Sequence, residues 1–107
     1  MIFEILWSAA RKGELILVQG GLCHYHLRRD GQLTIREILV LPEYQGGGVG
    51  SAMLEKLKTV PSIRSIFAKC PNELDANGWY EHMGFILEGE EITSSGRRLN
   101  LWRLPVL

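Results

Sequence analysis

The fold is decided by the stretch Ile38-Leu39-Val40-Leu41-Pro42-Glu43-Tyr44-Gln45-Gly46-Gly47-Gly48-Val49-Gly50-Ser51-Ala52. It begins as an apolar strand, passes through a cluster of glycines and continues into an amphipathic helix. Glycines allow successive backbone N–H groups to converge, because no Cβ is in the way, and the start of a helix adds partial positive charge. The stretch therefore predicts a binding site for a phosphate or diphosphate group.

Outward from this stretch, hydrophobic periodicity and turn residues predict the order αβββαβαββ. Gly20-Gly21 and Asp30-Gly31 are expected to form tight turns, so that the first three strands make an antiparallel meander. The strands on either side of the second helix should lie parallel, as in a βαβ unit. The fold class is α+β, with helices covering a mixed sheet. The predicted helices span residues 3–12, 51–59 and 75–83, and the predicted strands span residues 14–19, 22–28, 33–41, 63–70, 85–91 and 98–104.

Composition limits the classes of function. The 107 residues fit a single domain, 1–107. Twelve basic and twelve acidic residues cancel, whereas a nucleic-acid-binding protein normally carries a basic excess. Cys23 and Cys70 lack metal-ligand spacing and are expected to be buried thiols in a reducing cytosol. Because neither a signal peptide nor an apolar run of about 18 residues is apparent, the sequence predicts a cytoplasmic protein without membrane or nucleic-acid partners.

Two common nucleotide-binding motifs do not fit the glycine cluster. A Walker A loop needs Lys followed by Ser or Thr after its last glycine, whereas Gly50 is followed by Ser51 and Ala52. A dinucleotide fingerprint needs a third glycine at the GxGxxG spacing, where this chain has Ser51 or Met53. The spacing of the glycines therefore favours neither a Walker A loop nor a dinucleotide-binding loop.

The spacing Gln45-x-x-Gly48-x-Gly50 does resemble the Gln/Arg-x-x-Gly-x-Gly/Ala motif of the GNAT family, the GCN5-related N-acetyltransferases. The block ANGWYEHMGF at residues 76–85 is similar to the family's Ala-x-x-Phe-Tyr-x-x-x-Gly-Phe, and residues 98–104 resemble the last strand of small members. The resemblance covers residues 3–104. It implies a GNAT-like acyl-CoA N-acyltransferase fold that uses acetyl-CoA as co-substrate, without a metal, to acetylate a primary amine of a small molecule or protein.

The resemblance also implies which residues hold acetyl-CoA. The cofactor is expected to lie in a V-shaped opening between the strands at 33–41 and 63–70, with its carbonyl polarised by the backbone N–H of Val40. Asn72 and Asn77 are further candidate contacts, although capping of the next helix by Asn72 or Asp75 is the simpler interpretation. The pantetheine arm is assigned to the main chain of Leu39, Val40 and Leu41, and the diphosphate to Gln45, Gly46, Gly47, Gly48, Val49, Gly50 and Ser51.

Two side chains are candidates for proton transfer. The family motif implies that Tyr80 is the general acid, because a phenol stays protonated at neutral pH and can donate to a departing thiolate. Glu37 is the candidate base, since the next strand carries no carboxylate, although it could equally be a surface residue or be replaced by a chain of waters. His24 and His26 lack a third metal ligand. Trp7, Trp79 and Trp102 are expected in the core, and His82 in solvent.

One departure from the family pattern affects the acceptor. Typical members carry a further strand and longer helices ahead of the part that corresponds to residue 3, and in the family this region helps to form the acceptor wall. A second subunit of a homodimer could supply that wall. The same departure favours an alternative function, a CoA-binding module of GNAT fold without transferase activity.

Overall fold

The computed structural model describes residues 1–106. Within this range three α-helices and six strands follow the order αβββαβαββ, so the predicted α+β class and mixed sheet are confirmed. No helix in this range is long and apolar enough to cross a membrane. The elements are α1 (Ile2–Arg11), β1 (Leu15–Val18), β2 (Gly21–Leu27), β3 (Gln32–Val40), η1 (Pro42–Tyr44, a 3-10 turn), α2 (Val49–Leu57), β4 (Ser65–Pro71), α3 (Ala76–His82), β5 (Ile86–Ile92) and β6 (Arg98–Pro105).

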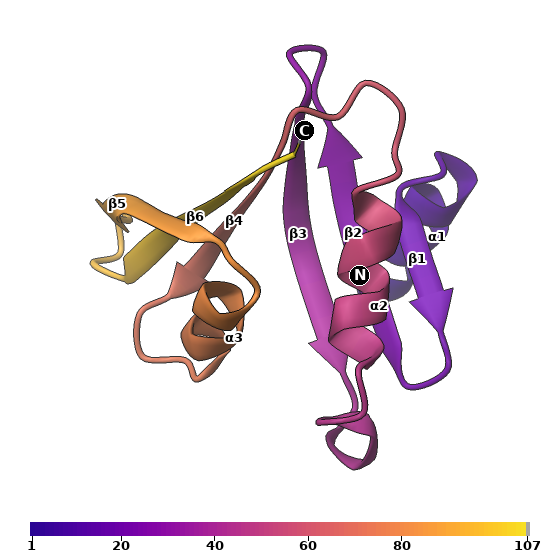
Figure 1. The fold of residues 1–107 in the computed structure, drawn as a ribbon, viewed down its shortest axis with the longest axis horizontal. Helices are drawn as coiled ribbons and strands as arrows, with labels where there is room; N and C mark the ends of the chain where they lie inside the picture. Colours follow the sequence, from indigo (N-terminus) through magenta and orange to yellow (C-terminus); the bar gives the residue numbers. More distant parts are fainter. Residues whose placement is uncertain (107) are drawn as a thin grey trace.

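The six strands form one sheet in the order β1-β2-β3-β4-β6-β5. Strands β3 and β4 pair in parallel, as the βαβ pattern predicted, and all other neighbours are antiparallel. In Figure 1 the sheet opens between β3 and β4, so that β1, β2 and β3 form one half and β4, β6 and β5 the other. The second half turns away from the first, and α2 and α3 lie on either side of the opening.

The opening starts at a β-bulge in β3. Parallel pairing with β4 begins at Gln32 and ends at Ile35, which lies opposite Ala68. The next residue, Arg36, has no partner in β2, because Tyr25 pairs with Ile35 while His24 pairs with Glu37. Such a bulge bends its strand and increases the local twist. The extra residue therefore coincides with the point at which β3 leaves β4.

The two faces of the sheet are covered unequally. Helix α2 buries Met53, Leu54 and Leu57 in the main core, which also contains Tyr80 from α3. Helix α1 contacts β1 and β2 and lies on the opposite face, beside His24 and other side chains that point away from α2. The core consists of Cys23, Leu33, Ile35, Met53, Leu54, Leu57, Ile66, Ala68, Cys70, Tyr80, Phe85 and Trp102.

Several local predictions are tested by this arrangement. Cys23 and Cys70 are both free and buried, as expected. The prediction that Trp7 lies in the core is wrong: α1 buries only Ala9, and Trp7 stacks on Phe3 with 58% of its surface exposed. Asp75 precedes α3 at the capping position, but its side chain makes no cap hydrogen bond because its backbone is already helical.

Candidate functional site

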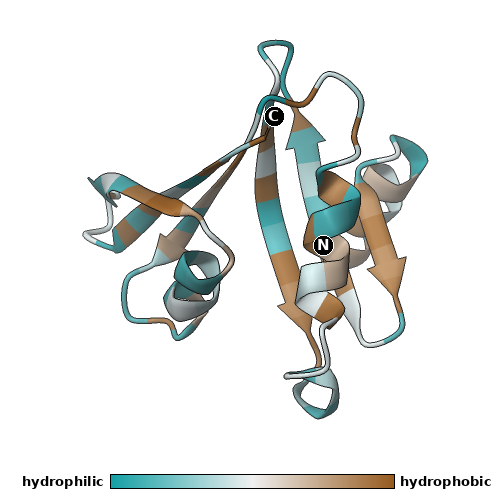
Figure 2. Ribbon diagram, in the orientation of Figure 1, coloured by the Kyte–Doolittle hydropathy of each residue, from teal (hydrophilic) through white to brown (hydrophobic). Residues whose placement is uncertain are grey.

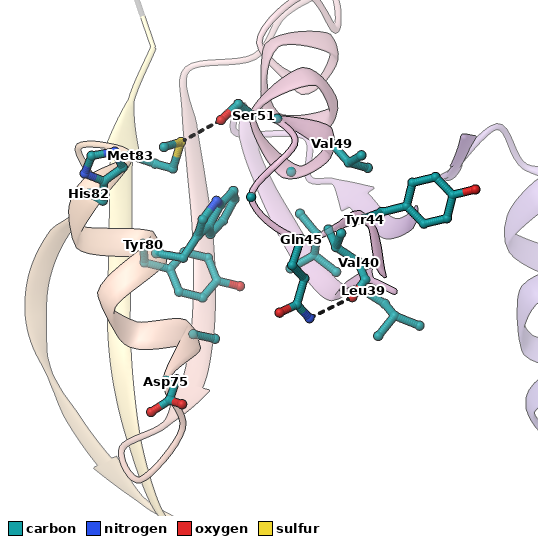
Figure 3. Close-up of a pocket in the computed structure, with 16 residues that line it drawn as sticks. Leu39, Val40, Tyr44, Gln45, Val49, Ser51, Asp75, Tyr80, His82 and Met83 are labelled. Carbon is teal, nitrogen blue, oxygen red and sulfur yellow. Dashed lines mark hydrogen bonds between the residues drawn. The ribbon is translucent and has the colours of Figure 1, made fainter. Parts of the chain in front are cut away.

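A cleft of about 780 Å³ occupies the opening between the two halves of the sheet. One wall is the C-terminal end of β3 with the turn that follows it, and the other is the side of α3 that carries Trp79, Tyr80 and Met83 (Figure 3). The start of α2 closes one end. The residues that line the cleft are Ile38, Leu39, Val40, Tyr44, Gln45, Gly46, Gly48, Val49, Gly50, Ser51, Asp75, Ala76, Trp79, Tyr80, His82 and Met83.

The glycine turn presents free backbone donors to this cleft. Gly46 and Gly48 adopt left-handed backbone angles, with φ of 81° and 85°. A Cβ would meet no atom within 4 Å at either position, so the backbone conformation, rather than lack of space, requires glycine. Gly48 is the N-cap of α2, and no side chain caps the helix. The first N–H groups of α2 are therefore open to a ligand in the cleft, as helix geometry dictates.

The start of α2 also touches the opposite wall. A Cβ on Gly50 would lie 3.2 Å from the indole ring of Trp79, so a side chain at Gly50 would press against that ring. One turn further along α3, the Met83 sulfur accepts a hydrogen bond from the hydroxyl of Ser51, the residue after Gly50, at 3.5 Å (Figure 3). These contacts fix the width of the cleft at its α2 end.

Tyr44 anchors the turn to the neighbouring β1–β2 hairpin. Its ring points away from the cleft (Figure 3) and lies against Gly20, where a Cβ would overlap the ring. Gln19 donates a hydrogen bond from its side-chain amide to the Tyr44 hydroxyl at 3.2 Å. The Gly20-Gly21 turn, predicted only as a hairpin, thus also holds the segment that carries the glycine cluster.

Gln45 lies across the β3 wall. Its side-chain amide donates a hydrogen bond to the carbonyl oxygen of Val40 at 3.1 Å (Figure 3). The main chain of Val40 was predicted to bind the pantetheine arm. This bond must therefore open, or be shared, before the Val40 carbonyl can accept a hydrogen bond from a ligand.

Tyr80 joins the core to the cleft. It is only 4% exposed, and its ring stacks on Trp102 and meets Phe85 edge-on, with ring centroids 6.3 and 5.1 Å away. Its hydroxyl points out of α3 into the cleft, towards the side of Gln45 (Figure 3). Burial raises the pKa of the Tyr80 phenol well above its usual value of 10, so the hydroxyl keeps its proton at neutral pH.

Comparison with known families shows to which family the domain belongs. The model of the acetyltransferase (GNAT) domain family matches residues 3–87, which include the glycine turn and Tyr80. The chain belongs to the GNAT acetyltransferase family. The resemblance seen in the sequence is thereby confirmed. No curated protein sequence matches the chain.

Solved structures share the GNAT fold at low sequence identity. Nourseothricin acetyltransferase has a TM-score of 0.74 and 23% identity, over 82% of this chain and 58% of its own. The ribosomal-protein-S18-alanine N-acetyltransferase from Escherichia coli has a TM-score of 0.72 and 20% identity. The match covers 96% of this chain and 76% of that enzyme's chain. A protein assigned as a streptothricin acetyltransferase from Bacillus anthracis, solved with acetyl coenzyme A, has a TM-score of 0.72 and 20% identity. The match covers 82% of this chain and 57% of that protein's chain. This chain thus spans little more than half the length of several relatives.

Most of the predicted GNAT site residues meet in the cleft, but five do not line it. Leu41 and Gly47 belong to the β3 end and the turn but lie outside the cleft lining. Asn72 is exposed in the loop before α3. Glu37 is exposed and shares a face with His24, on the side of the sheet that carries α1. Glu37 and Tyr80 therefore approach the opening from opposite sides of the sheet.

Asn77 has a structural use in this GNAT fold instead of a place in the cleft. Its side-chain amide donates to the carbonyl oxygens of Pro71 and Leu74, at 2.9 and 2.8 Å. Its side-chain oxygen accepts from Asn100 and from the Trp102 indole, at 3.0 and 2.9 Å. These four bonds use the side chain fully, so we correct the sequence-based assignment of Asn77 to cofactor binding.

Sequence reasoning missed part of the α3 wall. Trp79 and Met83 line the cleft, as does His82, which is exposed as expected. The signal was present in the sequence, because positions 76, 79, 80 and 83 recur at helical spacing and so share one side of α3. Of the two histidines of β2, His26 bonds to Glu14 at 2.6 Å, and residues 1–106 bring together no group of three or more His, Cys, Asp or Glu side chains that could hold a metal ion.

Proposed function

We propose that this GNAT domain transfers an acetyl group from acetyl-CoA to a primary amine. The observation that carries the proposal is the turn at residues 46–51, where the free amides at the start of α2 stand at one end of a cleft that continues along the β3 main chain to the Tyr80 hydroxyl. Unpaired N–H groups at a helix start bind a diphosphate, and an edge of unpaired strand backbone binds an extended amide-containing arm. The chemistry of this donor set fits the diphosphate and the pantetheine arm of CoA.

Each residue is proposed to have a limited task, since acetyl-CoA itself supplies the activated acyl group as a thioester. Gly48 and its neighbours hold the diphosphate, and Val40 holds the arm and polarises the carbonyl through its backbone N–H. Glu37 takes one proton from the acceptor's ammonium group, directly or through water, which leaves a neutral amine. The amine nitrogen bonds to the carbonyl carbon, the carbon–sulfur bond breaks, and Tyr80 gives its proton to the departing sulfur. The second proton, which the nitrogen loses as the amide forms, passes through water to the Tyr80 phenolate and restores it.

A thermal-shift titration followed by a turnover assay tests this proposal. CoA and acetyl-CoA should raise the melting temperature in a concentration-dependent way, by an amount that corresponds to about 2.7 kcal/mol at 100 times Kd, whereas NAD and ATP should not. Thiol release from acetyl-CoA should then depend on an added amine. Protection by CoA without thiol release from any amine would favour the alternative, a CoA-binding module that lacks transferase activity.

Tyr80→Phe separates catalysis from binding, because it removes only the hydroxyl and leaves the ring packed on Trp102. Loss of a general acid should lower kcat by about 100-fold or more. The Kd for CoA, measured by the same thermal titration, should change little. Equal losses of CoA binding and of turnover would instead show that Tyr80 has a structural role.

A further inference from the structure

A row of leucines crosses the sheet on the face opposite α2. Leu17 in β1 pairs with Leu22 in β2, and Leu22 pairs with Leu39 in β3. Directly opposed residues of neighbouring strands share a face, so the three side chains lie side by side. Leu17 is 74% exposed and Leu39 is 45% exposed. In this leucine row (Leu17, Leu22 and Leu39), the two outer side chains are thus open to solvent and Leu22 between them is half-buried.

The leucine row is continuous with the candidate active site. The side chain of Leu39 lies in the row, and Leu39 is also one of the residues that line the cleft. Glu37, the proposed base, lies two residues earlier on the same face, about 7 Å along the strand. In Figure 2 the middle of β3 is hydrophilic and its C-terminal end is hydrophobic, as is β1. A carboxylate and an apolar strip thus adjoin on one side of the opening.

The position of the cofactor decides which molecule can reach this strip. A diphosphate at Gly48 and a pantetheine arm beside Tyr80 would fill the side of the opening that α2 and α3 flank. An acceptor must then approach from the other face, where Glu37 and Leu39 point. Its ammonium group would meet Glu37, and the carbon atoms next to that group would lie over Leu39 and Leu22.

We propose that the leucine row binds the apolar part of the acceptor, so that the preferred acceptors are primary amines with an aliphatic or aromatic substituent. This inference rests on the proposed acetyltransferase function. The row takes no part in bond making. It lowers KM for apolar amines, because an apolar contact made equally in the ground state and the transition state changes binding rather than kcat.

A series of n-alkylamines from ethylamine to hexylamine tests the inference, with thiol release from acetyl-CoA as the readout. Each added methylene should raise kcat/KM about two- to fourfold, mainly through KM, because burial of one methylene favours binding by about that factor. Leu17→Ser and Leu22→Ser should flatten this dependence and leave kcat for ethylamine nearly unchanged. Leu17 is so exposed that its variant should fold normally. Ile92→Ser, a 65% exposed residue in β5 on the other edge of the sheet, is the matched control and should behave as wild type.

The possible outcomes separate the inference from the function on which it rests. Turnover that does not depend on alkyl length, or an equal effect of Ile92→Ser, overturns the role of the leucine row and leaves the transferase intact. A lack of thiol release from every amine overturns both. A dimer that forms with rising protein concentration and dissociates in Leu17→Ser, measured by sedimentation, would show that the row joins two copies of the chain, and would also overturn the inference.

Discussion

Tyr80 belongs to the core by its ring and to the cleft by its hydroxyl, and both properties follow from its place in α3. The ring is held by Trp102 and Phe85, so the hydroxyl has little freedom to move. The motif at residues 76–85 implied that Tyr80 is the general acid. It could not show how deeply the ring is buried, because Trp102, which stacks on the ring, belongs to β6 and lies far away in sequence. Burial raises the pKa of the Tyr80 phenol.

At the same scale, Cys23 makes stability sensitive to alkaline pH. Burial raises the pKa of its thiol from 9.0 to about 12, so the folded state holds the proton more tightly than the unfolded chain. This contribution is fully present below pH 9 and is lost as pH rises from about 9 towards 12, because the unfolded chain ionises first. For one such group the free energy of unfolding falls by about 1.4 kcal/mol per pH unit.

Urea denaturation between pH 8 and 10 measures this slope. Cys23→Ala is expected to lower the free energy of unfolding at every pH, since it leaves a cavity. Above pH 9, however, the free energy of unfolding of the variant should fall less steeply with pH than that of the wild type. Parallel curves for the two proteins would mean that the Cys23 thiol ionises equally easily in the folded and unfolded states.

Among the elements, the turn before α2 depends on backbone shape. Gly48→Ala forces a side chain into left-handed angles and should cost about 1–2 kcal/mol of stability, with weaker CoA binding because the amides lose their alignment. Gly78→Ala is the matched change inside α3, where a Cβ would meet no atom within 4 Å. It should raise stability by about 0.5–1 kcal/mol. Chemical denaturation and CoA titration of both variants provide the comparison, and a stabilised Gly48→Ala would contradict the geometry.

Helix α3 depends in turn on Asn77, which ties its start to the end of β4 and to β6. Asn77→Ala removes four hydrogen bonds and leaves half-buried partners unpaired, so we expect a loss of about 2–4 kcal/mol. Asn72→Ala changes an exposed asparagine in the loop before α3 and should alter stability by less than about 0.5 kcal/mol. Equal stability of the two variants, in the same denaturation experiment, would show that the Asn77 network contributes little.

The molecule as a whole is two half-sheets joined by a short parallel contact. Only residues 32–35 of β3 pair with β4, and the shared core of α2, α3 and the strands supplies the rest of the connection. A ligand that contacts both the glycine turn and α3 would bridge the two halves. The cleft is therefore the place where ligand binding and relative motion of the halves should be coupled.

Hydrogen exchange measures this coupling. CoA should slow the exchange of amides in residues 46–51, in the end of β3 beyond the bulge and in α3, because binding stabilises the native state and covers free N–H groups. Strands β1 and β5, at the two edges of the sheet, should change least. Protection confined to one half of the sheet would mean that the ligand does not bridge the cleft.

The sequence alone determined the elements, their order, the parallel β3–β4 pair and the glycine turn, because these depend on local periodicity, turn residues and backbone freedom. It also pointed to the family and to Tyr80 through two short motifs. Only the tertiary structure decided that Glu37 faces away from α2, that Asn77 is consumed by hydrogen bonds within the protein, that Trp7 is exposed and that Leu17, Leu22 and Leu39 align. These properties depend on strand register and on which face of the sheet each helix covers, and both are set by contacts between residues distant in sequence.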